Sequence, residues 1–189
     1  FVEHHFLTGF SASPCPDLVY AALSQRTKRI RLGLGVVVLP YHHPVRVAER
    51  VAMLDHLCRG RFYWGIGTRA IPTDLELYGL DPSDRRGVGE RSAEVLEVVL
   101  KIWQNEGKFE HHGKYFDISA PELDPVKERG LHMKPFQVPH PPISAAATTI
   151  RSDSIRNAGV QGWIPMSSPT LSVPNLTGHW EEYEAGATS

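Results

Sequence analysis

The hydrophobic positions of the chain alternate between short apolar runs and longer stretches of helical periodicity. The first run, 30–39, is rich in β-branched residues and predicts one strand buried on both faces, as in parallel sheets. Pro40 ends this strand, and Pro44 begins a helix that is expected to end at Gly60. The next apolar run, 61–67, predicts a second strand. A strand, a helix and a strand joined by short returns indicate a right-handed βαβ unit.

The rest of the chain continues this alternation around one long excursion at about 104–141. The pattern predicts helices at 17–25, 90–104 and 152–158, strands at 143–147 and 162–166, and a hairpin at 107–118 that turns near 112–113. The first two strands start about 31 residues apart, and eight such units would make about 250 residues, the size of a (β/α)₈ barrel. A doubly wound sheet is the competing arrangement, but Ala70 stands where a dinucleotide-binding loop has its third glycine.

Composition excludes several classes of function. The 189 residues carry a formal charge of -1, which is not that of a strongly basic nucleic-acid binder. The longest apolar run, 32–39, is far shorter than the ~20 residues that span a membrane, so no membrane partner is expected. Two cysteines are too few for a disulfide framework and indicate a reducing compartment, the cytoplasm. A basic cluster at 26–31 lacks an aromatic platform and is interpreted as a solvated strand entrance.

Histidines are the most chemically suggestive residues. Six of the ten occur as three neighbouring pairs: His4-His5, His42-His43 and His111-His112. Neighbours in a strand point to opposite faces, so such pairs rarely bind one metal, and we expect no metal site. The pair in the predicted hairpin is expected to be solvated, whereas a functional and a packed role for His4 remain equally open from the residues alone. Cys15 and Cys58 are interpreted as loop and packing residues rather than nucleophiles.

Seven motifs between residues 1 and about 165 resemble the bacterial luciferase-like flavin monooxygenases, in that family's order. They are Glu3-His4-His5-Phe6, Leu39-Pro40-x-x-His43-Pro44-Val45-Arg46-x-Ala48-Glu49, Leu54-Asp55, Gly60-Arg61-Phe62-x-x-Gly65-Ile66-Gly67, Gly113-Lys114-Tyr115-Phe116, Pro139-His140-Pro141-Pro142-Ile143 and Ala146-Ala147-x-Thr149-x-x-Ser152. The fold of that family is a (β/α)₈ barrel, in agreement with the independent spacing argument. Within the second motif, Arg46 and Glu49 are expected to pair.

The resemblance implies a flavin-dependent monooxygenase. Reduced FMN, supplied by a separate flavin reductase, would bind at the C-terminal mouth of the barrel and react with O₂ to a C4a-peroxyflavin that oxygenates a small organic substrate. His4 matches the active-site histidine that assists proton transfer, a task suited to imidazole near neutral pH. Glu3 matches a carboxylate near the flavin. The resemblance also implies a homo-oligomer, a dimer, for the full-length parent.

Other residues are implied to bind the cofactor. The Gly35-Val36 peptide matches a bulge behind the flavin ring, which has a non-proline cis bond in some members. Gly67 and Thr68 follow a predicted strand at the barrel mouth, and Thr149 and Ser152 match a hydroxyl-rich turn that can bind phosphate at a helix N-terminus. Arg86 is a second, weaker phosphate candidate.

Two alternatives to this function remain open. The same barrel could use a deazaflavin to move hydride without oxygen, or could be a non-catalytic flavin-binding remnant.

The chain also departs from the family pattern at the run Thr68-Arg69-Ala70. The loops 68–84 and 119–139 are expected to set specificity without revealing the substrate. At about 31 residues per unit, residues 1–189 predict an incomplete barrel without its first strand and last two strands. This polypeptide alone is therefore expected to be poorly soluble or to fail to bind FMN.

Overall fold

A computed structural model describes residues 1–5, 13–68, 71–122, 124–130 and 133–189. Its helices are α1 (Pro16–Arg26), α2 (Pro44–Cys58), α3 (Pro72–Leu77), α4 (Arg85–Gln104), α5 (Asp153–Gln161) and α6 (Leu176–Ala187), with 3-10 turns at Leu39–Tyr41 and Val173–Asn175. Its strands are β1 (Leu32–Gly33), β2 (Val37–Val38), β3 (Phe62–Gly67), β4 (Phe109–His112), β5 (Asp117–Ala120), β6 (Ile143–Ala147) and β7 (Ile164–Ser167). Phe6, Arg69 and Ala70, which the sequence motifs include, lie outside the described residues.

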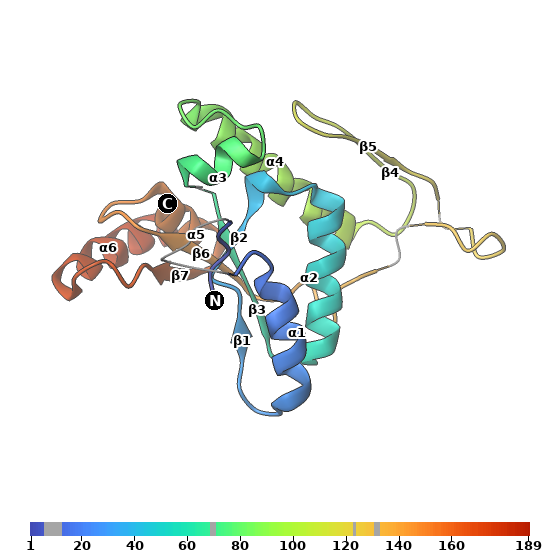
Figure 1. Ribbon diagram of the computed structural model, residues 1–189, viewed down its shortest axis with the longest axis horizontal. Coiled ribbons are helices and arrows are strands. Elements are labelled where there is room, and N and C mark those ends of the chain that lie inside the picture. Colours follow the sequence, from blue (N-terminus) through green and yellow to red (C-terminus); the bar gives the residue numbers. More distant parts are fainter. Residues whose placement is uncertain (6–12, 69–70, 123, 131–132) are drawn as a thin grey trace.

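The main sheet is parallel, and it confirms the α/β class. β3 pairs with β1 and β2 along one side and with β6 along the other, and β7 pairs with β6. α1 packs on α2 and α2 on α4 at one flank, while α5 and α6 pack together beside β6 and β7 at the other (Figure 1). Helices that return the chain between parallel strands are what a barrel of βα units requires.

The prediction of one continuous strand over 30–39 is wrong. The structure divides this run into β1 and β2, which both pair with β3. Between them, the Gly35 N–H donates to the carbonyl of Phe1 at 3.0 Å instead of to β3, and the Gly35–Val36 peptide bond is cis. An apolar run shows which residues are buried but not which carbonyl each amide finds, so the break is invisible in the pattern.

The core lies between the sheet and the helices α2 and α4. Trp64 of β3 is fully buried and meets Trp103 of α4 edge to face, with ring centroids 5.2 Å apart. Phe62 and Cys58 are also fully buried, which confirms the packing interpretation of Cys58. Burial raises the pKa of the Cys58 thiol, so the residue is an unreactive apolar contact.

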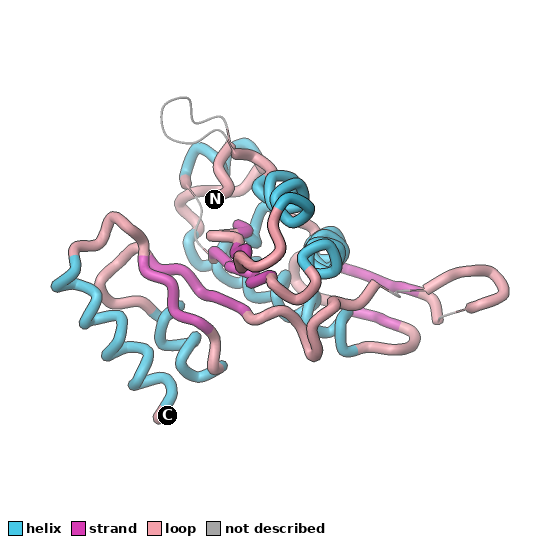
Figure 2. Tube along the Cα trace, turned by 90° about the horizontal axis from the view of Figure 1, so that it is seen from below, coloured by secondary structure: helices cyan, strands magenta, loops and turns pink. Residues whose placement is uncertain are grey.

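The predicted hairpin is present and extends away from the main sheet, as Figures 1 and 2 show. Its tip is held by Glu94 of α4, whose carboxylate accepts the N–H groups of Lys114, Tyr115 and Phe116 at 2.9–3.2 Å. His111 also contacts Glu94, at 3.1 Å, and is buried, so the expectation of a solvated residue is wrong. Strand alternation turns His111 toward α4 and its neighbour outward.

The excursion returns to the sheet through a second carboxylate. Asp55 of α2 is fully buried, and it accepts the backbone N–H of Gln137 at 2.8 Å and its side-chain amide at 2.7 Å. The same amide donates to the carbonyl of Phe62 at 3.0 Å. The excursion is therefore fastened to the barrel body before it enters β6.

Three helices differ from the sequence pattern. α4 begins at Arg85, five residues earlier than expected, because Asp84 caps it by accepting the N–H of Gly87 at 2.8 Å. The helices α3 and α6 were not expected. α3 is short and opens with Pro72, and α6 contains two glycines, so neither shows the apolar periodicity of a typical surface helix.

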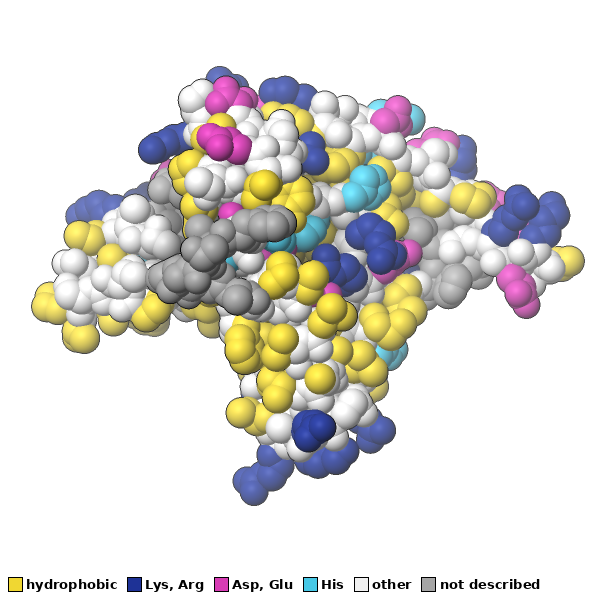
Figure 3. Space-filling view, viewed as in Figure 1, with side chains coloured by type: hydrophobic (Ala, Val, Ile, Leu, Met, Phe, Trp, Pro, Cys, Tyr) yellow, Lys and Arg dark blue, Asp and Glu magenta, His cyan; other side chains and the backbone are white. Residues whose placement is uncertain are grey.

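Exposed cations gather where α1 leads into β1, at the lower end of the view in Figure 3. They are Arg26, Lys28, Arg29 and Arg31. Their exposure agrees with the interpretation of a solvated strand entrance. Among the described residues, no helix is long and apolar enough to cross a membrane.

The close approach of β3 to the segment between β1 and β2 predicts a large effect at Gly65. A Cβ at Gly65 would stand 1.7 Å from the carbonyl oxygen of Leu34, which is backbone and cannot move aside alone. We expect Gly65→Ala to lower the free energy of unfolding by at least about 2 kcal/mol, as overpacking does. Urea denaturation measures this. The control is Gly89→Ala. Gly89 is an exposed residue of α4, and nothing lies within 4 Å of a Cβ placed there, so the free energy of unfolding should rise by about 0.5–1 kcal/mol. Equal stabilities for the two variants would contradict the packing.

Candidate active site

The carboxyl ends of the parallel strands meet at one edge of the sheet. The ladder pairs Val38 of β2 with Gly67 of β3, and Ala147 of β6 with Ser167 of β7. The segments that follow these residues therefore leave the sheet on the same side. Parallel βα folds place their binding sites at this end.

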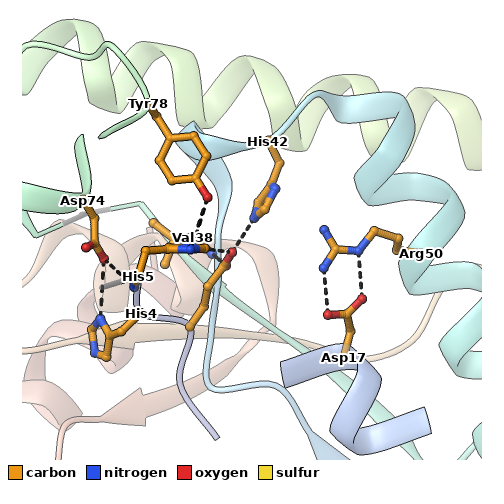
Figure 4. Close-up of polar contacts among 9 residues, drawn as sticks. His4, His5, Asp17, Val38, His42, Arg50, Asp74 and Tyr78 are labelled. Carbon is orange, nitrogen blue, oxygen red and sulfur yellow. Dashed lines mark hydrogen bonds and ion pairs between the residues drawn. The ribbon is translucent and has the colours of Figure 1, made fainter. Parts of the chain in front are cut away.

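Glu3 is the centre of the polar network at this edge. Its carboxylate is buried, and it accepts the Val38 N–H at 2.8 Å. The Nε2 atoms of His42 and His5 lie 2.7 Å and 3.3 Å from its Oε1 (Figure 4). Residues 1–5 form no strand, yet these bonds fix the segment against β2. Three donors around one buried carboxylate satisfy its charge.

The environment of Glu3 favours its ionised form. Burial alone would raise the pKa of its carboxyl group, but the hydrogen bond and charge of His42, the Val38 N–H and His5 together lower the pKa below the ordinary 4.5. Glu3 is thus a permanent anion at neutral pH. It orients two imidazoles rather than exchanging protons itself.

His4 lies beside a second buried carboxylate, that of Asp74 on α3. The distance from His4 Nδ1 to Asp74 Oδ2 is 3.8 Å, and the backbone N–H of His5 approaches the same oxygen at 3.4 Å (Figure 4). The backbone N–H of His4 donates to the carbonyl of Ser13 at 3.3 Å. The adjacent histidines therefore have different carboxylates: Asp74 faces the His4 ring, and Glu3 faces the His5 ring.

Two tyrosines form an aromatic wall next to these histidines. The rings of Tyr41 and Tyr78 stack with centroids 4.6 Å apart, and His5 meets both edge to face. Burial, followed by the negative charge of Asp74, raises the pKa of Tyr41, and burial likewise raises the pKa of Tyr78. Both phenols stay neutral over the physiological range.

The predicted cofactor residues just before β2 and at the end of β3 lie together. A Cβ at Gly67 would come within 2.4 Å of Val36 Cγ2, so this glycine lets the two strands approach. Gly35 lies next to Met166 of β7, whose sulfur would be 3.5 Å from a Cβ placed there. Thr68 follows Gly67, and its carbonyl accepts the Ser92 hydroxyl of α4 at 3.3 Å. The glycines thus let the Val36 and Met166 side chains pack closely against the backbone at this part of the edge.

Thr149 and Ser152 lie on the turn between β6 and α5, as predicted. The Thr149 hydroxyl donates to the carbonyl of Arg151 at 2.9 Å. Ser152 is the N-cap of α5, but its side chain makes no capping hydrogen bond. The turn is held from behind by buried His179 of α6, which contacts the Thr149 carbonyl and lies 2.8 Å from the Ser167 hydroxyl. The turn is thus braced, and its first-turn amides are not capped by Ser152.

Arg86 does not join the cluster of Figure 4. Its side chain is exposed on the first turn of α4 and pairs with Glu90 at 2.7 Å. Glu90 pairs with Lys114 as well, and both partners lower its pKa to about 2. The expected Arg46–Glu49 pair is confirmed, at 2.6 Å on the surface of α2. No group of three metal-ligating side chains suited to a metal ion occurs within the described ranges.

The sequence pattern did not indicate His42 or Asp74 as site residues. His42 adjoins His43 of the second motif, which was the available signal. In the structure His43 is exposed, and it is His42 that turns inward to Glu3. Asp74 left no such signal, because its proximity to His4 depends on the unexpected helix α3.

Comparison with known proteins gives a consistent result. Residues 1–185 match a family model described as luciferase-like monooxygenase. The chain is 34% identical over 188 residues to 4-hydroxyprotoasukamycin monooxygenase of Streptomyces nodosus subsp. asukaensis, covering 96% of this chain and 47% of that protein. It is 31% identical over 180 residues to the oxygenase component of a flavin-dependent trigonelline monooxygenase of Acinetobacter baylyi, covering 94% and 47%. The chain spans about half the length of these curated relatives.

Solved structures show the same fold. The oxygenating constituent of 3,6-diketocamphane monooxygenase from Pseudomonas putida, a type II Baeyer-Villiger monooxygenase in complex with FMN, superposes with a TM-score of 0.88 at 29% identity. The match covers 99% of this chain and 51% of that one. The parallel sheet is thus a curled half-barrel similar to those of luciferase-like barrel monooxygenases.

The ionised state of Glu3 predicts an acid-sensitive stability. Because its folded pKa lies below the unfolded value, its contribution is complete above about pH 4.5 and is lost as the pH falls through the folded pKa. We expect Glu3→Gln to cost about 1–3 kcal/mol at pH 7, from weakened charged hydrogen bonds, and less below pH 4. Urea denaturation from pH 3 to 8 measures this. Exposed Glu97→Gln is the control, and an acid limb unchanged by Glu3→Gln would contradict the assignment.

Proposed function

This chain belongs to the luciferase-like monooxygenase family, and we propose that the protein containing it binds reduced FMN and uses O₂ to oxygenate a small organic molecule. The observation that carries the proposal is the placement of His4. His4 faces the buried carboxylate of Asp74 and follows Glu3, which is bonded to Val38 of β2, the residue paired with Gly67 at the carboxyl end of β3. The proposal assigns residues 1–189 to one barrel domain, with 104–141 as an excursion.

Several residues fit a flavin at this edge. Gly35, Val36, Gly67 and Thr68 are brought together by the close approach of Gly67 to Val36, and they would offer backbone groups to a flat ring system. The turn at Thr149 and Ser152 offers hydroxyls and the N-terminus of α5 to a phosphate. Arg86 would reach a phosphate only by leaving Glu90. When bound, the reduced flavin supplies the electrons that activate O₂.

The chain's own residues would handle protons and exclude water. His4 would give or take a proton beside the flavin, since imidazole changes charge near neutral pH. Glu3 would keep the His5 and His42 rings oriented as a permanent anion. The stacked tyrosines would shield this region with neutral aromatic surface.

The named relatives support a flavin and a separate reductase. One is called flavin-dependent and an oxygenase component, and one solved neighbour holds FMN. These names favour FMN over a deazaflavin. The substrate is a small organic molecule whose shape the loops at the strand ends would select.

The test is oxygenation by the protein containing this chain, supplied with FMN, NAD(P)H and a flavin reductase, and with the substrates of its relatives as probes. We expect O₂-dependent product and anaerobic binding of reduced FMN. His4→Ala should lower kcat by about 10²–10⁴ while reduced FMN still binds, because proton transfer rather than binding is lost.

His56→Ala is the matched control and should keep full activity. This histidine lies near the far end of α2, where its ring contacts the Lys134 carbonyl at 2.9 Å. Unchanged turnover in His4→Ala would remove His4 from the reaction, and reduced FMN bound by the wild type without any product would indicate a non-catalytic barrel. Oxygen-independent hydride transfer with a deazaflavin, and none of the O₂-dependent activity, would replace the monooxygenase proposal.

A further inference from the structure

Asp74 is an unusual residue in the candidate site, because its carboxylate is fully buried yet poorly bonded. Among the described residues, the hydrogen bond to its Oδ2 is a long one, from the backbone N–H of His5 at 3.4 Å. Its Oδ1 has no hydrogen-bond partner within the described part of the chain. A buried carboxylate without close donors is costly, so native proteins rarely retain one without a role.

The side chain that Asp74 faces is His4. The 3.8 Å between Asp74 Oδ2 and His4 Nδ1 is within ion-pair range but longer than a hydrogen bond. A movement of less than about 1 Å would close it, and catalytic hydrogen bonds are often long before a ligand binds. Glu3 is occupied elsewhere, by His42, His5 and Val38. The two buried carboxylates thus serve different histidines.

We propose that Asp74 is the positioning residue of His4: it accepts the Nδ1–H of the imidazole and thereby leaves the lone pair on Nε2. The inference rests on the proposed function, which makes His4 the proton-handling group. When Nε2 takes a proton, the imidazolium that forms faces the Asp74 carboxylate and is stabilised by it. An imidazole without this partner would populate the other tautomer, with its proton on Nε2 and no base there.

The position of Asp74 on α3 explains how its carboxylate comes to face His4. α3 follows β3 at the carboxyl edge of the sheet, and Asp74 lies in its first turn, where a helix favours an acidic residue. Burial and the negative charge of Asp74 raise the pKa of Tyr41, so its phenol stays neutral and supplies no positive charge to Asp74. The imidazole of His4 can therefore balance the negative charge of the Asp74 carboxylate when the imidazole takes up a proton.

The direct test is the tautomer of His4, read by long-range ¹H–¹⁵N correlation in the ¹⁵N-labelled protein that contains this chain. The His4 signals are assigned by their loss in His4→Gln. We expect the Nδ1–H form in the wild type and a mixture or the Nε2–H form in Asp74→Asn and Asp74→Leu. Asp55→Asn is the matched control: this acid is equally buried, but it bonds to Gln137. It should leave the His4 signals unchanged.

Kinetics provide the second readout. Asp74→Asn should lower kcat by about 10-fold or more, as the loss of an orienting carboxylate does, with KM and the Kd of reduced FMN changed less than about threefold. Asp74→Glu, which keeps the carboxylate, should recover part of kcat. Asp55→Asn should lower stability without this split between kcat and KM.

The outcomes separate this inference from the proposed function. A wild-type His4 in the Nε2–H form, or a tautomer that Asp74→Asn and Asp74→Leu leave unchanged, overturns the role of Asp74 even if the protein oxygenates its substrate. The wild-type measurement decides this even if no Asp74 variant folds. Loss of FMN binding by the wild type, with the Nδ1–H form present, overturns the proposed function and leaves the Asp74–His4 pair standing.

Discussion

The buried carboxylate of Glu3 is the interaction on which the arrangement of the site depends. The first five residues form no strand and so have few ladder bonds to hold them. Glu3 replaces those bonds by accepting the Val38 N–H and by contacting His42, which joins the N-terminal segment to β2 and to the turn before α2. The position of His4 follows from this attachment, because the next residue in an anchored extended segment has little freedom.

The two buried carboxylates at this edge of the sheet, Glu3 and Asp74, have unequal surroundings. Glu3 is surrounded by donors, and its pKa is lowered. Asp74 lies opposite the neighbouring histidine with far fewer partners. Two carboxylates in one small region would repel each other, but the His4-His5 segment lies between them and each faces one ring. Glu3 is thus a fully bonded anion that holds the segment in place, whereas one oxygen of Asp74 has no hydrogen-bond partner within the described part of the chain.

The sequence predicted the parts of the fold that follow from local pattern. The strand Ile143–Ala147 has the expected bounds, because a small-residue apolar run between prolines and hydroxyls has one plausible structure. The Pro44 helix was equally readable. The break between β1 and β2 was not, since it depends on a hydrogen bond from Gly35 to Phe1, far away in sequence. Glu3 and His4 belong to a sequence motif and could be recognised from it. Asp74 could not, because its proximity to His4 depends on the fold.

The excursion is fastened by Glu94 at the hairpin tip, by His56 at the Lys134 carbonyl, and by Asp55 where Gln137 returns to the sheet. Each of these side chains lies on α2 or α4 and binds backbone groups of the excursion, so each contact depends largely on the path of the chain. Where a contact involves backbone alone, it does not constrain which side chain the excursion carries there. This segment can change in length and composition over evolutionary time while the sheet edge and its histidines keep their places. A fold built this way can acquire new molecular partners without rebuilding the site that serves them.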